Sequence, residues 1–234
     1  MRVLVACEES QTVCLAFRSR GHEAYSNDII ECSGGHPEWH LQMDALEAVK
    51  LMDWDLMVGH PPCTYLSYVG TRHWNDPGRI AKRLEALEFF RQLWEAPIER
   101  ICLENPKGCA SPVIAKYTQE IQPYYFGDNA IKTTWLWLKN LPPLRHTKSD
   151  TLFDKKTHVN KPDPIYFLKT NGKPIHWVEA NHGGKNRSVF WPGIASAMAS
   201  QWGETSKLGT TADADSRSGV KALLNPMKEV CDNT

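Results

Sequence analysis

The stretch "RVLVACEESQTVCLAFRSRGHEAYSNDI" (residues 2–29) decides the fold class, because it predicts a strand, a helix and a second strand in succession. Residues 2–7 form a short apolar run with β-branched side chains, which is typical of a buried strand. Residues 10–21 have apolar side chains at helical spacing and end at Gly21. Residues 22–29 predict the next strand. Two strands joined through a helix indicate a parallel sheet.

The same alternation continues over the first 120 residues. Strands are predicted at 55–60, 100–105 and 133–140, and helices at 45–52, from Asp76-Pro77-Gly78 to about Trp94, and at 111–121. We therefore expect an α/β fold with a mostly parallel sheet and helices on both faces. Ligands of such folds lie beyond the carboxyl ends of the strands, so the residues that follow each strand are the candidate site.

Length and composition narrow the class of protein. The chain has 234 residues, enough for one sizeable α/β domain. Its apolar runs are far shorter than the roughly 18 to 20 residues that cross a bilayer, and "MRVLVAC" lacks the zones of a signal peptide. The seven cysteines include no CxxC pair. We expect a cytoplasmic protein with no membrane partner, with thiols instead of disulfides, and with no bound metal.

Charge is distributed unevenly along the chain. The formal net charge is zero, yet the segment from Lys132 to Arg187 holds eleven Lys or Arg against four Asp or Glu. This asymmetry predicts a basic face for a polyanion such as DNA, and a solvated lysine-rich surface is the alternative. Residues 141–186 are predicted to be an irregular basic insertion, 187–203 a last helix, and 204–234 a polar, flexible tail.

The most constrained strand end is "DLMVGHPPCTYLS" (residues 55–67). Pro61 and Pro62 fix their own φ and restrict the residues before them, so Cys63 is held on a stiff turn at the end of an apolar run. The alternative is that Cys63 is a small buried hydrophobe. One strand later, "LENP" (103–106) places Glu104 and Asn105 at the equivalent strand end.

Together these motifs resemble those of DNA (cytosine-5)-methyltransferases. The Pro-Pro-Cys turn with Ser67 four residues on resembles their nucleophile loop, and Glu104-Asn105 their Glu-Asn pair. "SNDI" with Asp28, and "HLQMDA" with Asp44, resemble the segments that hold the ribose and the adenine of the cofactor. The resemblance covers about residues 2–140, and it implies a Rossmann-like class I methyltransferase fold, residues 1–140 as the catalytic domain, S-adenosylmethionine as cofactor and DNA as partner.

The resemblance also implies a role for each residue. Cys63 would add as a thiolate to carbon 6 of cytosine, Glu104 would hydrogen-bond the base, and Asn105 and Pro62 would shape the site. A cytosine in duplex DNA must leave the stack to reach Cys63. The residues expected to bind the cofactor are Cys7, Glu8, Ser10, Gln11, Asp28, Ile29, Asp44, Ala45, His60 and Pro61. Those expected to bind nucleic acid are Ser67, Arg72, Lys132, Lys155, Lys156 and Arg187.

The chain departs from the family pattern at its first turn. A glycine-rich stretch is usual there, whereas Glu8, Glu9, Ser10 and Gln11 occupy it here. The glutamates would either repel the carboxylate of the cofactor or bind its ammonium group. Two other functions stay open: the same chemistry on a free pyrimidine nucleotide or RNA, and a non-catalytic binding protein that has lost the cofactor. Asp28 and Asp44 have turn or cap roles as their alternative.

Overall fold

A computed structural model describes residues 1–69, 74–146, 161–176, 180 and 190–204. These residues belong to one compact unit, Met1–Glu204. The predicted tail lies almost wholly outside the described residues, as do Arg72, Lys155, Lys156 and Arg187.

Seven of the described strands form one sheet in the order β3-β2-β1-β4-β5-β7-β6. The strands are β1 (Arg2–Ala6), β2 (Glu23–Asp28), β3 (His40–Gln42), β4 (Leu56–Gly59), β5 (Arg100–Pro106), β6 (Gln119–Ile121) and β7 (Thr134–Lys139). Pairing is parallel except at β7, which runs antiparallel to both β5 and β6. This is a Rossmann-like α/β fold with a mostly parallel sheet, and the predicted fold class is confirmed.

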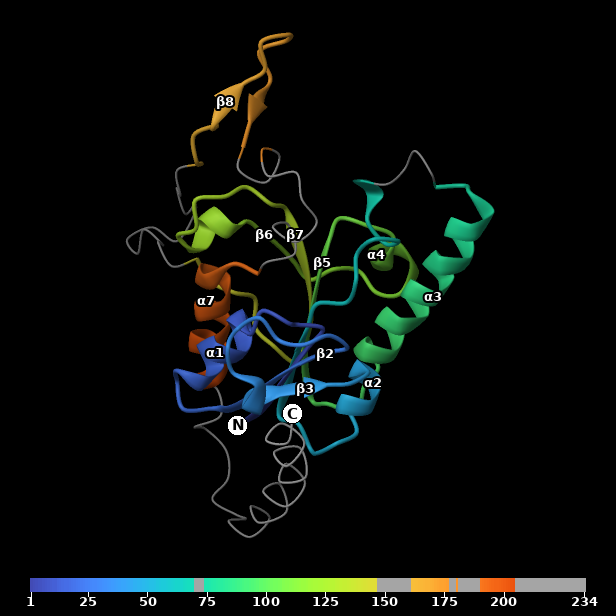
Figure 1. The fold of residues 1–234 in the computed structure, drawn as a ribbon, viewed down its shortest axis with the longest axis vertical. Helices are drawn as coiled ribbons and strands as arrows, with labels where there is room; N and C mark the ends of the chain where they lie inside the picture. Colours follow the sequence, from blue (N-terminus) through green and yellow to red (C-terminus); the bar gives the residue numbers. More distant parts are fainter. Residues whose placement is uncertain (70–73, 147–160, 177–179, 181–189, 205–234) are drawn as a thin grey trace, which may run out of the picture. The chain divides into compact units, whose positions relative to one another are not determined.

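Helices cover both faces of the sheet (Figure 1). α1 (Thr12–Arg18) and α7 (Pro192–Gly203) pack side by side on one face, and α3 (Pro77–Trp94) and α4 (Ala110–Val113) lie on the other. The remaining described elements are α2 (Ala45–Ala48), the 3₁₀ turns η1 (Pro37–Trp39) and η3 (Pro123–Phe126), and the hairpin of β8 (Tyr166–Phe167) and β9 (Pro174–Ile175).

The central strands are buried on both faces, which explains their continuous apolar sequences. In β1, Val3 and Val5 pack with Phe17 of α1 and Trp202 of α7 in the main core cluster. On the opposite face, the ring of Phe90 in α3 meets Trp137 of β7 edge to face at 5.0 Å. Alternating residues of each strand thus serve two different helical layers.

The sequence-based prediction of a helix over 111–121 is wrong. α4 ends at Val113, and residues 119–121 form strand β6 instead. Backbone pairing decides this, because Thr118 N donates to Leu136 O at 2.8 Å and Gln119 lies opposite Leu136 in the register. Sheet pairing outweighs the weak local helical preference. The helix predicted at 45–52 is also shorter and ends at Ala48, whereas α3 begins and ends as predicted.

Replacing Phe17 by alanine tests the packing of α1 against the sheet. Phe17 has no exposed surface, so we expect the free energy of unfolding to fall by about 3 to 5 kcal/mol in urea denaturation. Phe167→Ala is the matched control, because Phe167 is 61% exposed, and its effect should stay within about 0.5 kcal/mol. Equal losses in both variants would contradict the proposed core.

Candidate active site

Strand register builds the candidate site. Ala6 of β1 lies opposite Gly59 of β4, and Gly59 lies opposite Leu103 of β5. The next residues along these three neighbouring strands are Cys7, His60 and Glu104, so the parallel pairing sets them in one row at the carboxyl edge of the sheet. Asp28, at the end of β2, extends the row on the other side of β1. The sequence-predicted strand ends are therefore neighbours in space.

Glu104 and His60 form a pair across β5 and β4. Glu104 Oε2 lies 3.4 Å from His60 Nδ1, and each side chain is 12% exposed. Burial by itself would raise the pKa of Glu104. The hydrogen bond from His60, the positive charge of Lys132 and a hydrogen bond from Thr134 outweigh burial, so the pKa is lowered. Glu104 is therefore a shielded carboxylate that is held in its ionised form.

Asn105 ties strand β5 to the Pro-Pro-Cys turn. Its side chain is buried, and Nδ2 donates to the carbonyl oxygen of Pro61 at 2.7 Å. The carbonyl of Cys63 then accepts hydrogen bonds from the backbone of Leu66 at 3.1 Å and Ser67 at 2.9 Å, which closes a tight turn. The side chain of Cys63 is exposed, so the alternative of a buried structural cysteine does not hold.

A second contact fixes the far end of this turn. Ser67 bridges Gly108, and Cys109 N donates to Leu66 O at 2.9 Å. Only glycine fits at position 108, because a Cβ there would lie 2.2 Å from Leu66 O. The turn is thus held at both of its ends by residues of one segment: Asn105 binds Pro61 at the start, and Gly108 and Cys109 pair with Ser67 and Leu66 at the end.

Helix α3 lines the outer side of the turn. Arg79 donates to the carbonyl of Thr64 at 2.9 Å, and the Arg79 guanidinium and the Lys82 ammonium lie 5.2 and 5.5 Å from the ring centre of Tyr65. A cavity of about 370 Å³ opens between the turn and the helix. It is lined by Pro62, Tyr65, Lys82, Glu85, Ala86 and Phe89. Two basic side chains thus lie against Tyr65, two residues after Cys63.

The first turn keeps a glycine-like backbone without glycine. Cys7 and Gln11 both have φ of 59°, in the left-handed region that glycine normally occupies. Glu8 lies between them and is buried, and its two carboxylate oxygens accept hydrogen bonds from Val13 N at 2.6 Å and Cys14 N at 3.1 Å. Glu8 therefore satisfies backbone donors in the first turn of α1.

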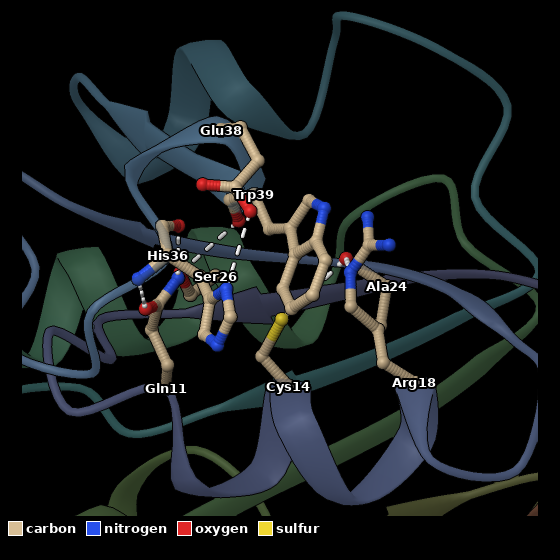
Figure 2. A network of polar contacts seen from close by, with 8 residues as sticks. All are labelled: Gln11, Cys14, Arg18, Ala24, Ser26, His36, Glu38 and Trp39. Atoms are coloured by element: carbon tan, nitrogen blue, oxygen red, sulfur yellow. Dashed lines mark hydrogen bonds and ion pairs between the residues drawn. The ribbon is translucent and has the colours of Figure 1, made fainter.

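Gln11 fastens the loop before β3 onto this turn (Figure 2). Its side-chain nitrogen donates to His36 O at 2.8 Å and to Ser26 Oγ at 3.1 Å, and its oxygen accepts from His36 N at 3.0 Å. The His36 ring stacks on the Trp39 ring, with 4.1 Å between the ring centres. The guanidinium carbon of Arg18 also lies over the Trp39 ring, 4.1 Å from its centre. The polar groups of Gln11 are thus engaged within the protein.

Asp28 and Asp44 lie near Cys7. Burial raises the pKa of Cys7 to about 12, and the negative charges of Asp28 and Asp44 add to the effect. Asp44 is exposed and caps α2 by accepting from Leu46 N at 2.8 Å, while Asp28 accepts from Ile30 N at 3.3 Å. The cap and turn roles are thus real, and both carboxylates still lie close enough to Cys7 to act on its pKa.

The other predicted residues occupy different surroundings. Ile29 is 72% exposed next to Asp28, and Ala45 is the buried first residue of α2. Ser10 Oγ lies 3.1 Å from Thr12 Oγ1, and Ser67 Oγ accepts from Val69 N at 3.3 Å. Two contributors escaped the sequence analysis: Thr134, which hydrogen-bonds Glu104, and Phe190, whose ring centre lies 4.5 Å from that of His60. They come from distant segments with no motif to mark them.

Within the part of the chain that the structure describes, no three His, Cys, Asp or Glu side chains gather as a metal site. The described helices are all too short or too polar to cross a membrane.

Comparison with known proteins gives distant similarities to solved structures. No protein-family model matches the chain, and no curated protein matches it. A solved structure from E. coli, described as a "putative DNA modification methyltransferase encoded within prophage", is 16% identical with a TM-score of 0.40. The alignment covers 59% of this chain and 46% of that one, so the chain spans less than half of that protein's length.

The buried Glu8 carboxyl predicts a pH dependence of stability. Burial raises the pKa of Glu8, against the opposing effects of His60 and of the Val13 and Cys14 amides. Between the ordinary and the raised pKa, the folded protein keeps a proton that the unfolded chain has released, so the free energy of unfolding falls as pH rises. Glu8→Gln should remove this fall, as measured by urea unfolding from about pH 4 to 8. The exposed Glu47→Gln should follow the wild type, and parallel curves for all three proteins would contradict the prediction.

Proposed function

We propose that the chain is an S-adenosylmethionine-dependent methyltransferase that acts on carbon 5 of cytosine in DNA. The observation that carries this proposal is the hydrogen bond from Asn105 Nδ2 to Pro61 O, 2.7 Å long. It joins the end of β5, where Glu104 lies, to the turn that exposes Cys63. Between these two strand ends, the sulfur of Cys63 can act on carbon 6 of a pyrimidine while the Glu104 carboxylate binds the edge that carries the exocyclic amine.

The chemistry assigns one task to each side chain. Carbon 5 of cytosine is a weak nucleophile, and a bond from Cys63 Sγ to carbon 6 moves an electron pair toward carbon 5. Glu104 accepts a hydrogen bond from the exocyclic amine, which identifies the base as cytosine and orients its ring toward Cys63. S-adenosylmethionine, when bound, supplies an electrophilic methyl group. The Cys63 sulfur leaves again when carbon 5 loses its proton to water.

The carboxyl ends of β1, β2 and β3 fit the cofactor in part. Asp28 suits ribose hydroxyls, because a carboxylate accepts two hydrogen bonds, and Asp44 suits the adenine amine. The exposed Ile29 offers an apolar surface for the adenine ring. Glu8 and Gln11 differ, since their polar atoms are engaged with backbone groups. We assign to Glu8 and Gln11 the role of fixing the conformation of the turn. Asp28, Ile29 and Asp44 are the residues that we assign to cofactor binding.

The hairpin of β8 and β9 is the proposed contact to DNA within the described part of 141–186. Ile165 lies directly before β8 and its backbone N donates to Ile175 O, so it shares one face of the ribbon with Phe167, and both side chains are more than half exposed. Lys161, Lys169 and Lys173 are exposed along the same segment, against the single acid Asp163. Lysines suit phosphates, and a two-stranded ribbon can enter the major groove.

Cofactor binding is the first test. Titration calorimetry with S-adenosylhomocysteine should give binding to the wild type and a loss of at least about tenfold in affinity for Asp28→Ala, because the ribose contact is charge-assisted. Asp53→Ala, at an exposed position, is the matched control and should bind like the wild type. No heat at millimolar ligand would favour the alternative of a non-catalytic binding protein.

Transfer of labelled methyl groups tests the nucleophile. Cys63→Ser should lower incorporation into duplex DNA at least about 1,000-fold, since the covalent step is lost, while the half-buried Cys32→Ser should not. Base analysis of the product should show 5-methylcytosine. Equal labelling by wild type and Cys63→Ser would overturn the mechanism. Parallel reactions with RNA and dCMP decide between DNA and the alternative acceptors.

A further inference from the structure

We infer that His60 is a positioning residue that holds the Glu104 carboxylate toward the base through its Nδ1–H group. This inference rests on the proposed function, and it gives His60 a role different from the cofactor contact that the sequence predicts. His60 stands directly after β4 and Glu104 lies near the end of β5, next to one another in the register. Nδ1 and Oε2 are 3.4 Å apart. Catalytic hydrogen bonds are often long before substrate binds and tighten in the complex.

Of the two possible neutral tautomers of His60, the hydrogen-bond surroundings suit one better. Nε2 is buried and has no hydrogen-bond partner among the described residues, whereas Nδ1 faces Glu104. A proton on Nε2 would leave a buried donor without an acceptor, which is costly. A proton on Nδ1 is used by the carboxylate, and only a lone pair stays unpaired on Nε2. The Nδ1–H tautomer therefore suits the site best.

Groups from four segments surround the His60–Glu104 pair and fix its geometry. Glu8, after β1, lies close enough to His60 for the two groups to interact electrostatically. Lys132 and Thr134, before and within β7, act on Glu104. The Phe190 ring packs against the imidazole, with ring centres 4.5 Å apart, and Asn105 holds the backbone of Pro61, the residue after His60. The imidazole thus has little freedom to rotate away from the carboxylate.

This arrangement gives His60 a defined effect on the reaction. A donor on Oε2 keeps Glu104 ionised and fixes the plane of its carboxylate. An ionised, oriented carboxylate accepts a hydrogen bond from the exocyclic amine of cytosine, and this contact holds the ring where Cys63 Sγ can reach carbon 6, which acts on kcat through orientation. His60 therefore acts through Glu104 and does not itself need to touch the base.

A pair of isosteric variants tests the inference. The side-chain nitrogen of asparagine lies as many bonds from the backbone as Nδ1, and that of glutamine as many as Nε2. In methyl transfer to duplex DNA, His60→Asn should keep kcat within about threefold, and His60→Gln should lower it about 10- to 100-fold with little change in KM. The acid limb of the kcat/KM profile should move to higher pH in His60→Gln only. Equal activity of both variants, or the reverse order, would overturn the inference.

A second measurement separates failure of this inference from failure of the proposed function. Long-range ¹H–¹⁵N NMR spectra report the histidine tautomer without any methyl transfer. We expect the Nδ1–H form for His60 in the wild type and a shift of its ¹⁵N resonances in Glu104→Gln. An Nε2–H tautomer, or resonances unmoved by Glu104→Gln, would overturn the positioning role even in an active enzyme. An inactive wild type with the expected spectra would instead overturn the proposed function alone.

Discussion

Parallel pairing of β1, β4 and β5 in one register is the constraint on which the site depends. It sets Cys7, His60 and Glu104 in one row, although 97 positions of sequence separate the first from the last. The strands themselves are apolar and buried on both faces. Their stabilisation therefore comes from apolar side chains that pack against the two helical layers. Because the register is fixed by burial, the polar residues that follow the strands need no further device to bring them together.

Polar contacts beyond the strands then refine this row. The Asn105 amide holds Pro61, and Gly108 admits the close approach of Leu66, so the turn bearing Cys63 is attached on both sides of its apex. His60 and Glu104 use the same strand ends for electrostatics. The same strand ends therefore hold the stiff proline turn in place and shield the Glu104 carboxylate from solvent.

The sequence predicted the parts of this molecule that depend on local pattern. β1, β2, β4, β5 and β7, together with the proline-initiated helix α3, follow from apolar runs and caps, and the strand-end rule correctly selected His60, Glu104 and Asn105 as neighbours. The tryptophans 135, 137 and 202 are buried in the core, as their size favours. Residues 119–121 were missed because pairing with β7 decides them. Thr134 and Phe190 were missed because only tertiary contact brings them to Glu104 and His60.

The turn after β1 adopts a left-handed backbone conformation that glycine usually provides, although it contains no glycine. Cys7 and Gln11 adopt left-handed angles, and the buried Glu8 carboxylate and the Gln11 amide hold them there through contacts to α1 and to the loop around His36. A ligand that approaches such a turn contacts main-chain atoms and makes no direct contact with the side chains behind them. Motif definitions written in glycines therefore describe only one solution to this geometry, and chains that stabilise the same curve with internal polar anchors will escape them.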